Sequence, residues 1–260
     1  MLVLAAVQGI TEFLPVCSDG HLALVEPLLR GSHSEAPNSM DLTIVLHLGT
    51  LGSILVYYRE RIFRLLGEDR RVLPLIIVGT IPAAALVLGC KFLLDEEFEE
   101  KLKSVLLTGF MLPVTGAAVL WAHYRGGGQR DYRELTWLDS LLIGLAQATA
   151  ILPGLSRSGA TIAAGLGRGM MRTSAATYSF LLAIPALAGA GAYEAFSMIK
   201  DPKPLSASPL NMTIGAIAAF FVGLAAISLL TRILERGRLH YFGWYCIALG
   251  LIVIALNWPR

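Results

Sequence analysis

Apolar residues run in long stretches along this sequence, and short polar loops separate them. A helix that crosses the hydrocarbon core of a bilayer needs about 20 predominantly apolar residues. Six stretches come close to this length or exceed it, so each of them predicts a full membrane span. These are residues 42–58, 73–90, 104–121, 175–196, 210–230 and 241–256.

Two further apolar stretches are interrupted by proline and glycine. Residues 1–29 are interrupted after Pro15 by a predicted break over Ser18–Gly20, and residues 137–166 are broken by Pro153 and Gly154. The pieces of the first stretch are too short to span the bilayer. We therefore predict two helix–loop–helix hairpins, each of which enters and leaves the membrane by the same face. Backbone freed at such a break is tolerated at membrane depth only where protein buries it or where it lines a wet cavity.

The order of hairpin and spans occurs twice. One hairpin and three spans fill residues 1–125, and the same order returns in residues 137–258, with corresponding spans starting 133 to 137 residues apart. Because three spans is an odd number, the second copy must cross the membrane in the opposite direction. The sequence therefore predicts one all-α, polytopic membrane domain over residues 1–260. It is an inverted repeat with six full transmembrane helices and two re-entrant hairpins.

Composition and charge agree with this topology. The chain is 55% hydrophobic and 15% charged, whereas soluble domains carry roughly 25% charged residues. Four loops hold 13 of the 21 Lys and Arg residues, so the positive-inside rule places them in the cytoplasm. The first hairpin then opens toward the outside. The basic loops are residues 59–71, 123–138, 167–174 and 231–238, which leaves 30–41, 95–103 and 197–209 outside.

Two classes of segment and partner are not expected. The N-terminal residues before the first hairpin motif carry no basic residue, so we do not expect a cleaved signal peptide. The net charge is only +2, and basic residues do not alternate with aromatic ones, so nucleic acid is not an expected partner.

Polar side chains gather at the break of the first hairpin. A carboxylate such as Glu12 at membrane depth costs roughly 2.5–3.5 kcal/mol on insertion scales, which makes it a functional-site candidate. Ser18 is a candidate nucleophile and His21 a candidate acid/base. Gln8 and Glu12 lie four residues apart on one helical face, where their oxygens suit Mg²⁺ or Ca²⁺. The same two residues could equally cap or hydrogen-bond the opposite hairpin.

The break of the second hairpin has the composition of an anion site. A half-helix that starts there directs N–H groups and a positive dipole end into the cavity, and Arg157 adds a two-pronged donor suited to phosphate. Ser156, Ser158 and Thr161 add hydroxyls, and Gly154 permits close backbone approach. The alternative is a plain kink with a snorkelling arginine, but Arg157 lies in the middle of the stretch and not at an end.

Two other polar residues are given smaller roles. Asp19 lies next to the candidate site and could reach the same ion, although solvation of a loop tip is the favoured reading. His47 lies within a predicted span, and we interpret it as a hydrogen-bonding residue between helices in preference to a supporting residue of the site.

At these residues the sequence resembles a known family, the bacitracin-resistance type undecaprenyl-diphosphate phosphatases. The resemblance covers essentially the whole chain and rests on two motifs. They are Gln8-x-x-x-Glu12-Phe13-Leu14-Pro15-Val16-x-Ser18-x-Gly20-His21 and Pro153-Gly154-x-Ser156-Arg157-Ser158-Gly159-x-Thr161. Two departures matter. Cys17 stands where the family usually has a second serine, and Gln8 leaves Glu12 as the only carboxylate of its pair.

The resemblance implies an enzyme integral to the bacterial plasma membrane, with a site reached from the extracytoplasmic side and dependent on a divalent cation. Its substrate would be a polyprenyl diphosphate, and its product the monophosphate carrier that is recycled for peptidoglycan and other envelope polymers. Together with the residues, this predicts attack by Ser18, assisted by His21 or Glu12, with Arg157 holding the phosphates. Attack by a water activated by Glu12 stays open. The prenyl tail would lie between helices or among the membrane lipids.

Two other functions share features with this sequence. Inverted repeats with facing hairpins are also transporter architecture, so a polyprenyl phosphate transporter or flippase is the alternative. The acid-phosphatase type of membrane lipid phosphatase is set aside because no histidine follows Arg157 before His240. The accepted tail length, the physiological cation and the formation of a homodimer are left open by the sequence.

Overall fold

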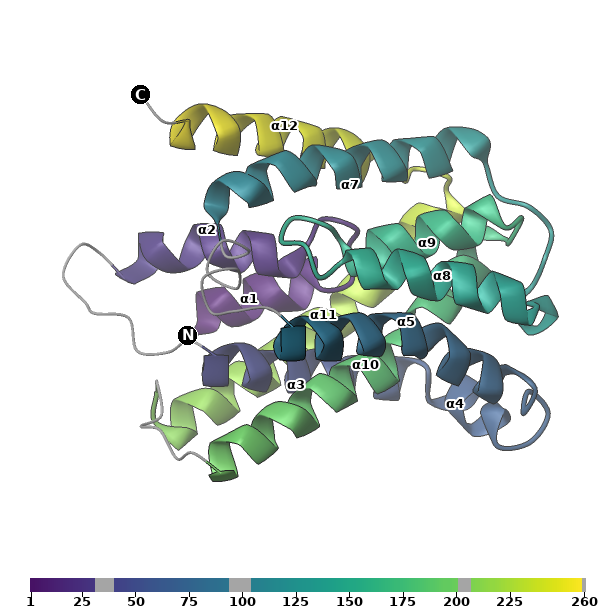
Figure 1. Cartoon of the computed structure of the whole chain (residues 1–260), viewed down its shortest axis with the longest axis horizontal. Coiled ribbons are helices and arrows are strands. Elements are labelled where there is room, and N and C mark those ends of the chain that lie inside the picture. The colour runs from purple at the N-terminus through teal and green to yellow at the C-terminus, as the bar shows by residue number, and fades with distance from the viewer. Residues whose placement is uncertain (31–39, 94–103, 201–206, 259–260) are drawn as a thin grey trace.

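The computed structural model describes residues 1–30, 40–93, 104–200 and 207–258, and nearly all of these residues are helical (Figure 1). No β-strand occurs in these ranges, where Arg130 and Met170 form one isolated bridge. The elements are α1 (Leu2–Thr11), α2 (Ser18–Arg30), α3 (Met40–Tyr57), α4 (Arg59–Leu65), α5 (Val72–Leu93), α7 (Val105–Arg125), the 3₁₀ turn η1 (Tyr132–Glu134), α8 (Trp137–Thr149), α9 (Arg157–Gly167), α10 (Arg172–Lys200), α11 (Pro209–Glu235) and α12 (His240–Asn257).

Five of these helices, α5, α7, α10, α11 and α12, are long and apolar enough to cross a membrane. A sixth span exists if α3 and α4 are taken together, although their axes bend by 74° at Tyr58. The protein is therefore an all-helical, polytopic membrane protein. The region after residue 58, predicted as a plain loop, begins instead with the short helix α4. Phe63 of α4 and Leu66, which follows the helix, are exposed beside arginines, a pattern that suits the membrane–water interface.

Both interrupted stretches are broken at their prolines, but the first break lies earlier than predicted, because Ser18–Gly20 already form the first turn of α2. The first break runs from Glu12 to Cys17, and the second separates Thr149 from Arg157. The four half-helices contain only 10 to 13 residues, too few to span a bilayer. Figure 1 shows α1–α2 approaching from the left and α8–α9 from the right. The breaks touch, since the Ser158 hydroxyl donates to the Leu14 carbonyl at 3.2 Å.

The remaining helices surround the two hairpins. Helix α1 packs on α11, α8 packs on α5, and α7 runs along α12 at one edge of the molecule (Figure 1). Small residues allow close contact: a Cβ on Gly144 would lie 2.2 Å from the Gly79 carbonyl oxygen across the α5–α8 interface. Close backbone approach at small residues is the usual way in which helices associate inside a membrane.

Thr115 of α7 holds the second break in place from outside the hairpin. Its hydroxyl donates to the Gly154 carbonyl at 2.8 Å and accepts from the Ser156 N–H at 3.0 Å. Gly154 itself has φ +94°, and a Cβ there would lie 2.6 Å from the Thr108 carbonyl oxygen. The polar backbone freed by the break is therefore paired within the protein, as burial at membrane depth requires.

The basic loops meet at one end of the molecule. Arg130 donates to the Arg168 carbonyl at 3.0 Å and to the Asp139 carboxylate at 2.7 Å, and Arg168 donates to the same carboxylate at 2.6 Å. Tyr132 reaches Asp69 of the loop after α4 at 2.9 Å. Loops 59–71, 123–138 and 167–174 therefore share one face. The loops predicted on the other side, 30–41, 95–103 and 197–209, lie largely outside the described residues.

Candidate active site

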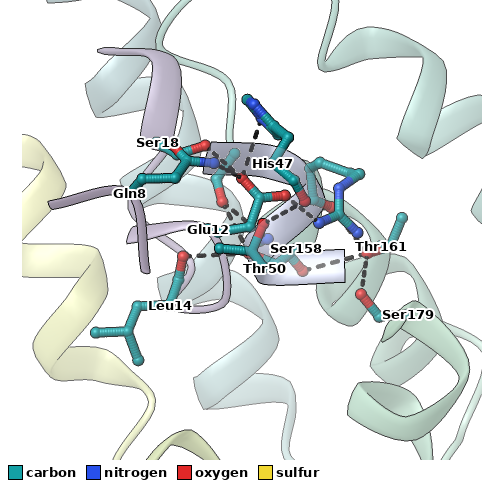
Figure 2. Close-up of polar contacts among 12 residues, drawn as sticks. Gln8, Glu12, Leu14, Ser18, His47, Thr50, Ser158, Thr161 and Ser179 are labelled. Carbon is teal, nitrogen blue, oxygen red and sulfur yellow. Dashed lines mark hydrogen bonds and ion pairs between the residues drawn. The ribbon is translucent and has the colours of Figure 1, made fainter. Parts of the chain in front are cut away.

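The Glu12 carboxylate is the centre of a hydrogen-bond cluster at the meeting point of the two breaks (Figure 2). Its Oε2 accepts from Gln8 Nε2 at 3.0 Å and from the Ser18 hydroxyl at 2.7 Å. Its Oε1 accepts from Arg157 Nη2 at 2.7 Å. Glu12 is buried, so these contacts replace the water that a charged carboxylate would otherwise need.

Local chain geometry brings these groups together. Gln8 lies one helical turn before Glu12. Cys17 adopts φ +68°, a left-handed conformation that is uncommon for a residue with a Cβ, and it reverses the chain so that Ser18 faces back toward Glu12. Ser18 and Arg157 are the first residues of α2 and α9. Two half-helices thus begin at the site, and their N-terminal ends favour negative charge there.

Hydroxyls of the second hairpin bind mostly within the protein. Ser156 caps α9 by accepting from the Gly159 N–H at 3.1 Å, and Thr161 is bonded to the Arg157 carbonyl at 2.8 Å and to Ser179 at 2.6 Å. Ser158 contacts Ser156 at 3.1 Å besides its bond to the first hairpin. All are buried. Of the hydroxyl residues predicted to bind substrate, the structure brings Ser156 to the cavity, whereas Ser158 and Thr161 shape the break behind it.

A cavity of about 260 Å³ opens over this cluster. Its polar wall contains Glu12, Ser18, Asp19, His47, Gln147, Ser156 and Arg157. A second cavity of about 410 Å³ lies between α5 and α10 and is lined almost entirely by apolar residues. Ala83, Val87, Ala186 and Ala190 border both cavities. A charged cluster thus adjoins an apolar groove.

His21 lies outside this cluster. Its Nδ1 is 2.7 Å from the Cys17 carbonyl oxygen and its Nε2 is 2.7 Å from the Tyr245 hydroxyl, with the two rings stacked. A carbonyl only accepts, so Nδ1 carries the proton and, in the neutral ring, Nε2 accepts from Tyr245. The structure does not bring Ser18 and His21 together. Of the two partners predicted for Ser18, this arrangement favours Glu12.

Polar residues on the cavity wall that were not predicted as site residues include Asp19, His47 and Gln147. Asp19, for which solvation of a loop tip was favoured, lines the cavity next to Ser18. His47 donates through Nδ1 to the Thr43 carbonyl at 2.8 Å and places Nε2 3.5 Å from Glu12 Oε2. Gln147 is buried near the end of α8. The available signals were a histidine inside an apolar stretch and a glutamine six residues before Pro153, much as Gln8 precedes Pro15 by seven. Either signal alone also suits a purely structural residue.

The predicted cation ligands Gln8 and Glu12 lie side by side, and part of their oxygen capacity is unused. Gln8 turns its amide nitrogen toward Glu12, while its Oε1 is buried without a partner among the described residues. Glu12 Oε2 accepts from Gln8 and Ser18, whereas its Oε1 accepts only from Arg157. Gln8 Oε1 and Glu12 Oε1 are therefore the oxygens that would hold a divalent cation. Among the residues that the structure describes, no group of three or more His, Cys, Asp and Glu side chains could hold a metal ion.

Fold and site together define a polytopic membrane protein whose two interrupted hairpins present a carboxylate, a hydroxyl and a guanidinium to one cavity. The family model described as "Bacitracin resistance protein BacA" matches residues 1–252, and the chain belongs to this family.

Curated relatives extend over nearly the whole chain. A protein of Rhodopirellula baltica named "Undecaprenyl-diphosphatase" is 43% identical over 257 residues, which cover 99% of this chain and 97% of that protein. Proteins of the same name from Corynebacterium efficiens and Carboxydothermus hydrogenoformans are 38% and 36% identical. Those matches cover 99% and 98% of this chain, and 89% and 96% of the respective relatives.

Proposed function

We propose that the protein hydrolyses undecaprenyl diphosphate, or a closely related polyprenyl diphosphate, to the monophosphate and inorganic phosphate. The observation that carries the proposal is the convergence of Ser18, Glu12 and Arg157 at the start of two half-helices. Phosphoryl transfer needs mainly positioning and stabilisation of negative charge, which these groups supply. Family membership and the names of the relatives support the same reaction. The monophosphate carrier is thereby returned to envelope synthesis.

The hydrogen bonds of the cluster support a serine-nucleophile mechanism. The Ser18 oxygen attacks the terminal phosphorus while its proton passes to Glu12 Oε2, 2.7 Å away. The bond between that phosphorus and the bridging oxygen breaks, and the polyprenyl monophosphate leaves. Water then attacks the phosphoserine, the bond between phosphorus and the Ser18 oxygen breaks, and Glu12 returns its proton to that oxygen while the protons of the water leave with the inorganic phosphate. Gln8 and Arg157 orient Glu12 throughout, and Arg157 Nη1, which has no partner among the described residues, is free to bind phosphate.

The substrate tail is proposed to occupy the apolar cavity between α5 and α10. The shared wall at Ala83 and Ala186 joins this cavity to the polar one, so a diphosphate and its first prenyl units can bind side by side. The cavity of about 410 Å³ is too small for a long polyprenyl chain, whose remainder would stay in lipid.

We propose that the helices form an inverted repeat of six spans and two re-entrant hairpins, in the bacterial plasma membrane, with the cavity open to the extracytoplasmic side. Helix packing supports the repeat. Helix α1 contacts α11 and its counterpart α8 contacts α5, while the third spans α7 and α12 contact each other. Exchange of the two halves would therefore preserve these contacts. The clustering of basic loops on one face supports the orientation.

The decisive test is phosphate release from undecaprenyl diphosphate by the purified protein in detergent. Wild type should release phosphate and Ser18→Ala should not, while Ser228→Ala, a hydroxyl removed from α11 outside the cavity, should match wild type. A transporter or flippase leaves no product in detergent, so absence of release from wild type would overturn the proposal. Repetition with a chelator tests the need for Mg²⁺ or Ca²⁺, which we expect to reach the site with the diphosphate.

A further inference from the structure

Gln147 is an amide side chain that the structure leaves unused. It lies in the last turn of α8, is 4% exposed, and lines the cavity beside Glu12 and Arg157. Neither its Oε1 nor its Nε2 has a hydrogen-bond partner among the described residues. Gln8 differs, because its amide nitrogen is bound to Glu12.

A structural role does not account for this side chain. The Gln147 side chain is not needed to cap the C-terminus of α8, because the backbone N–H of Ala150 is already bonded to backbone carbonyls of the last turn. Burial of an amide without a hydrogen-bond partner is unfavourable, and leucine would fill the same space without that cost. A glutamine at such a position therefore indicates a ligand that pairs with it.

The same cavity contains a second unused donor. Arg157 Nη1 is buried and has no partner within the described part of the chain, although Nη2 is bound to Glu12. Gln147 and Arg157 belong to the two arms of one hairpin, α8 and α9, and both line the cavity. Two residues that line one cavity and carry unpaired N–H donors, next to a half-helix N-terminus, suit an anion with several acceptor oxygens.

We infer that Gln147 is a substrate-binding residue whose side-chain amide donates to the diphosphate oxygens. It is the neutral donor to the anion, and Arg157 is the charged donor. This inference rests on the proposed function. The two donors differ in one respect that matters here. The charge of Arg157 is already shared with Glu12 at 2.7 Å, whereas the Gln147 amide is neutral and fully available. Gln147 thus adds a hydrogen bond to the anion without a further charge in the membrane.

Gln147→Leu tests this directly, because it removes the amide and keeps the volume. For undecaprenyl diphosphate in detergent, kcat/KM should fall about 10- to 100-fold, as expected for one lost hydrogen bond to a charged group. The change should appear mainly in KM. Gln129→Leu, at an exposed loop position away from the cavity, is the matched control and should leave kcat and KM unchanged.

The melting temperature of the substrate-free protein separates binding from structure. Gln147→Leu should melt at the wild-type temperature or above it, because an unpaired amide has been removed. It should also lose most of the thermal stabilisation that wild type gains from added undecaprenyl diphosphate. An unchanged KM, or a melting temperature that falls in step with activity, would overturn the inference. If wild type binds this lipid without releasing phosphate, the proposed function fails, and the loss of thermal stabilisation in Gln147→Leu still decides the role of Gln147.

Discussion

The partner of Ser18 can be identified by coupling single substitutions. The Ser18 hydroxyl donates to Glu12 Oε2 at 2.7 Å, while both ring nitrogens of His21 are occupied by Cys17 and Tyr245. General-base assistance is typically worth about 10²- to 10⁴-fold, so Glu12→Gln and Ser18→Ala should each lower kcat by at least this much. Because the two residues act as a unit, the double variant should be hardly worse than either single one.

His21→Gln should behave differently. Loss of its two hydrogen bonds should cost roughly 2 kcal/mol of stability, while kcat stays within an order of magnitude of wild type. In the double variant with Ser18→Ala, the fold-losses in kcat of the two single variants should multiply. Tyr245→Phe removes one side of the same contact, so its effect on the melting temperature should not add to that of His21→Gln.

The assay is phosphate release in detergent with the melting temperature of each variant measured in parallel. Glu12 is not the partner of Ser18 if His21→Gln abolishes turnover at an unchanged melting temperature and causes no further loss of kcat in the Ser18→Ala background. In that case His21 must swing toward Ser18 when substrate binds. Full additivity of Ser18→Ala and Glu12→Gln would instead mean independent roles, as in attack by a water that Glu12 activates.

Three further expectations follow from the site and the loops. Arg157→Lys should lose most activity although the charge is kept, because one ammonium cannot serve Glu12 and phosphate as the forked guanidinium does, and near wild-type turnover would contradict this. Gln8→Ala should raise the Mg²⁺ or Ca²⁺ concentration for half-maximal activity after chelator treatment, because the unpartnered Gln8 Oε1 is free to bind the cation; an unchanged concentration would mean that Gln8 only supports Glu12. A cysteine at Ser34 or Ser206, both outside the described residues, should react with an impermeant thiol reagent in intact cells and one at Gly127 should not, relative to the unsubstituted protein; the opposite pattern would reverse the orientation.

Much of the fold could be predicted because membrane helices depend on local properties. Apolar length marks the spans, and proline with glycine marks the breaks, so the bounds of α5, α7 and α10 to α12 lie close to the predicted ranges. Helix α4 was missed because its arginines read as a loop, whereas an interfacial helix exposes apolar and charged faces together.

The site was predictable only in part. Glu12, Ser18 and Arg157 converge as their motifs suggest. The direction of the His21 side chain depends on the left-handed backbone at Cys17. A cysteine in the sequence does not predict this conformation, which is usual for glycine. His47 and Gln147 reach the cavity from α3 and α8 through helix packing, which a pattern along the chain does not encode.

The wall shared by the two cavities has a consequence for turnover. Substrate and lipid product carry the same tail, so the proposed contacts of that tail with α5 and α10 would stabilise both equally. Such uniform binding cannot speed the chemical step. Stronger contacts between the tail and these helices would instead make the monophosphate a tighter-binding competitor of the diphosphate. Discrimination between the two lipids therefore depends on the few donors around Glu12, because these groups interact with phosphate oxygens and not with the prenyl tail.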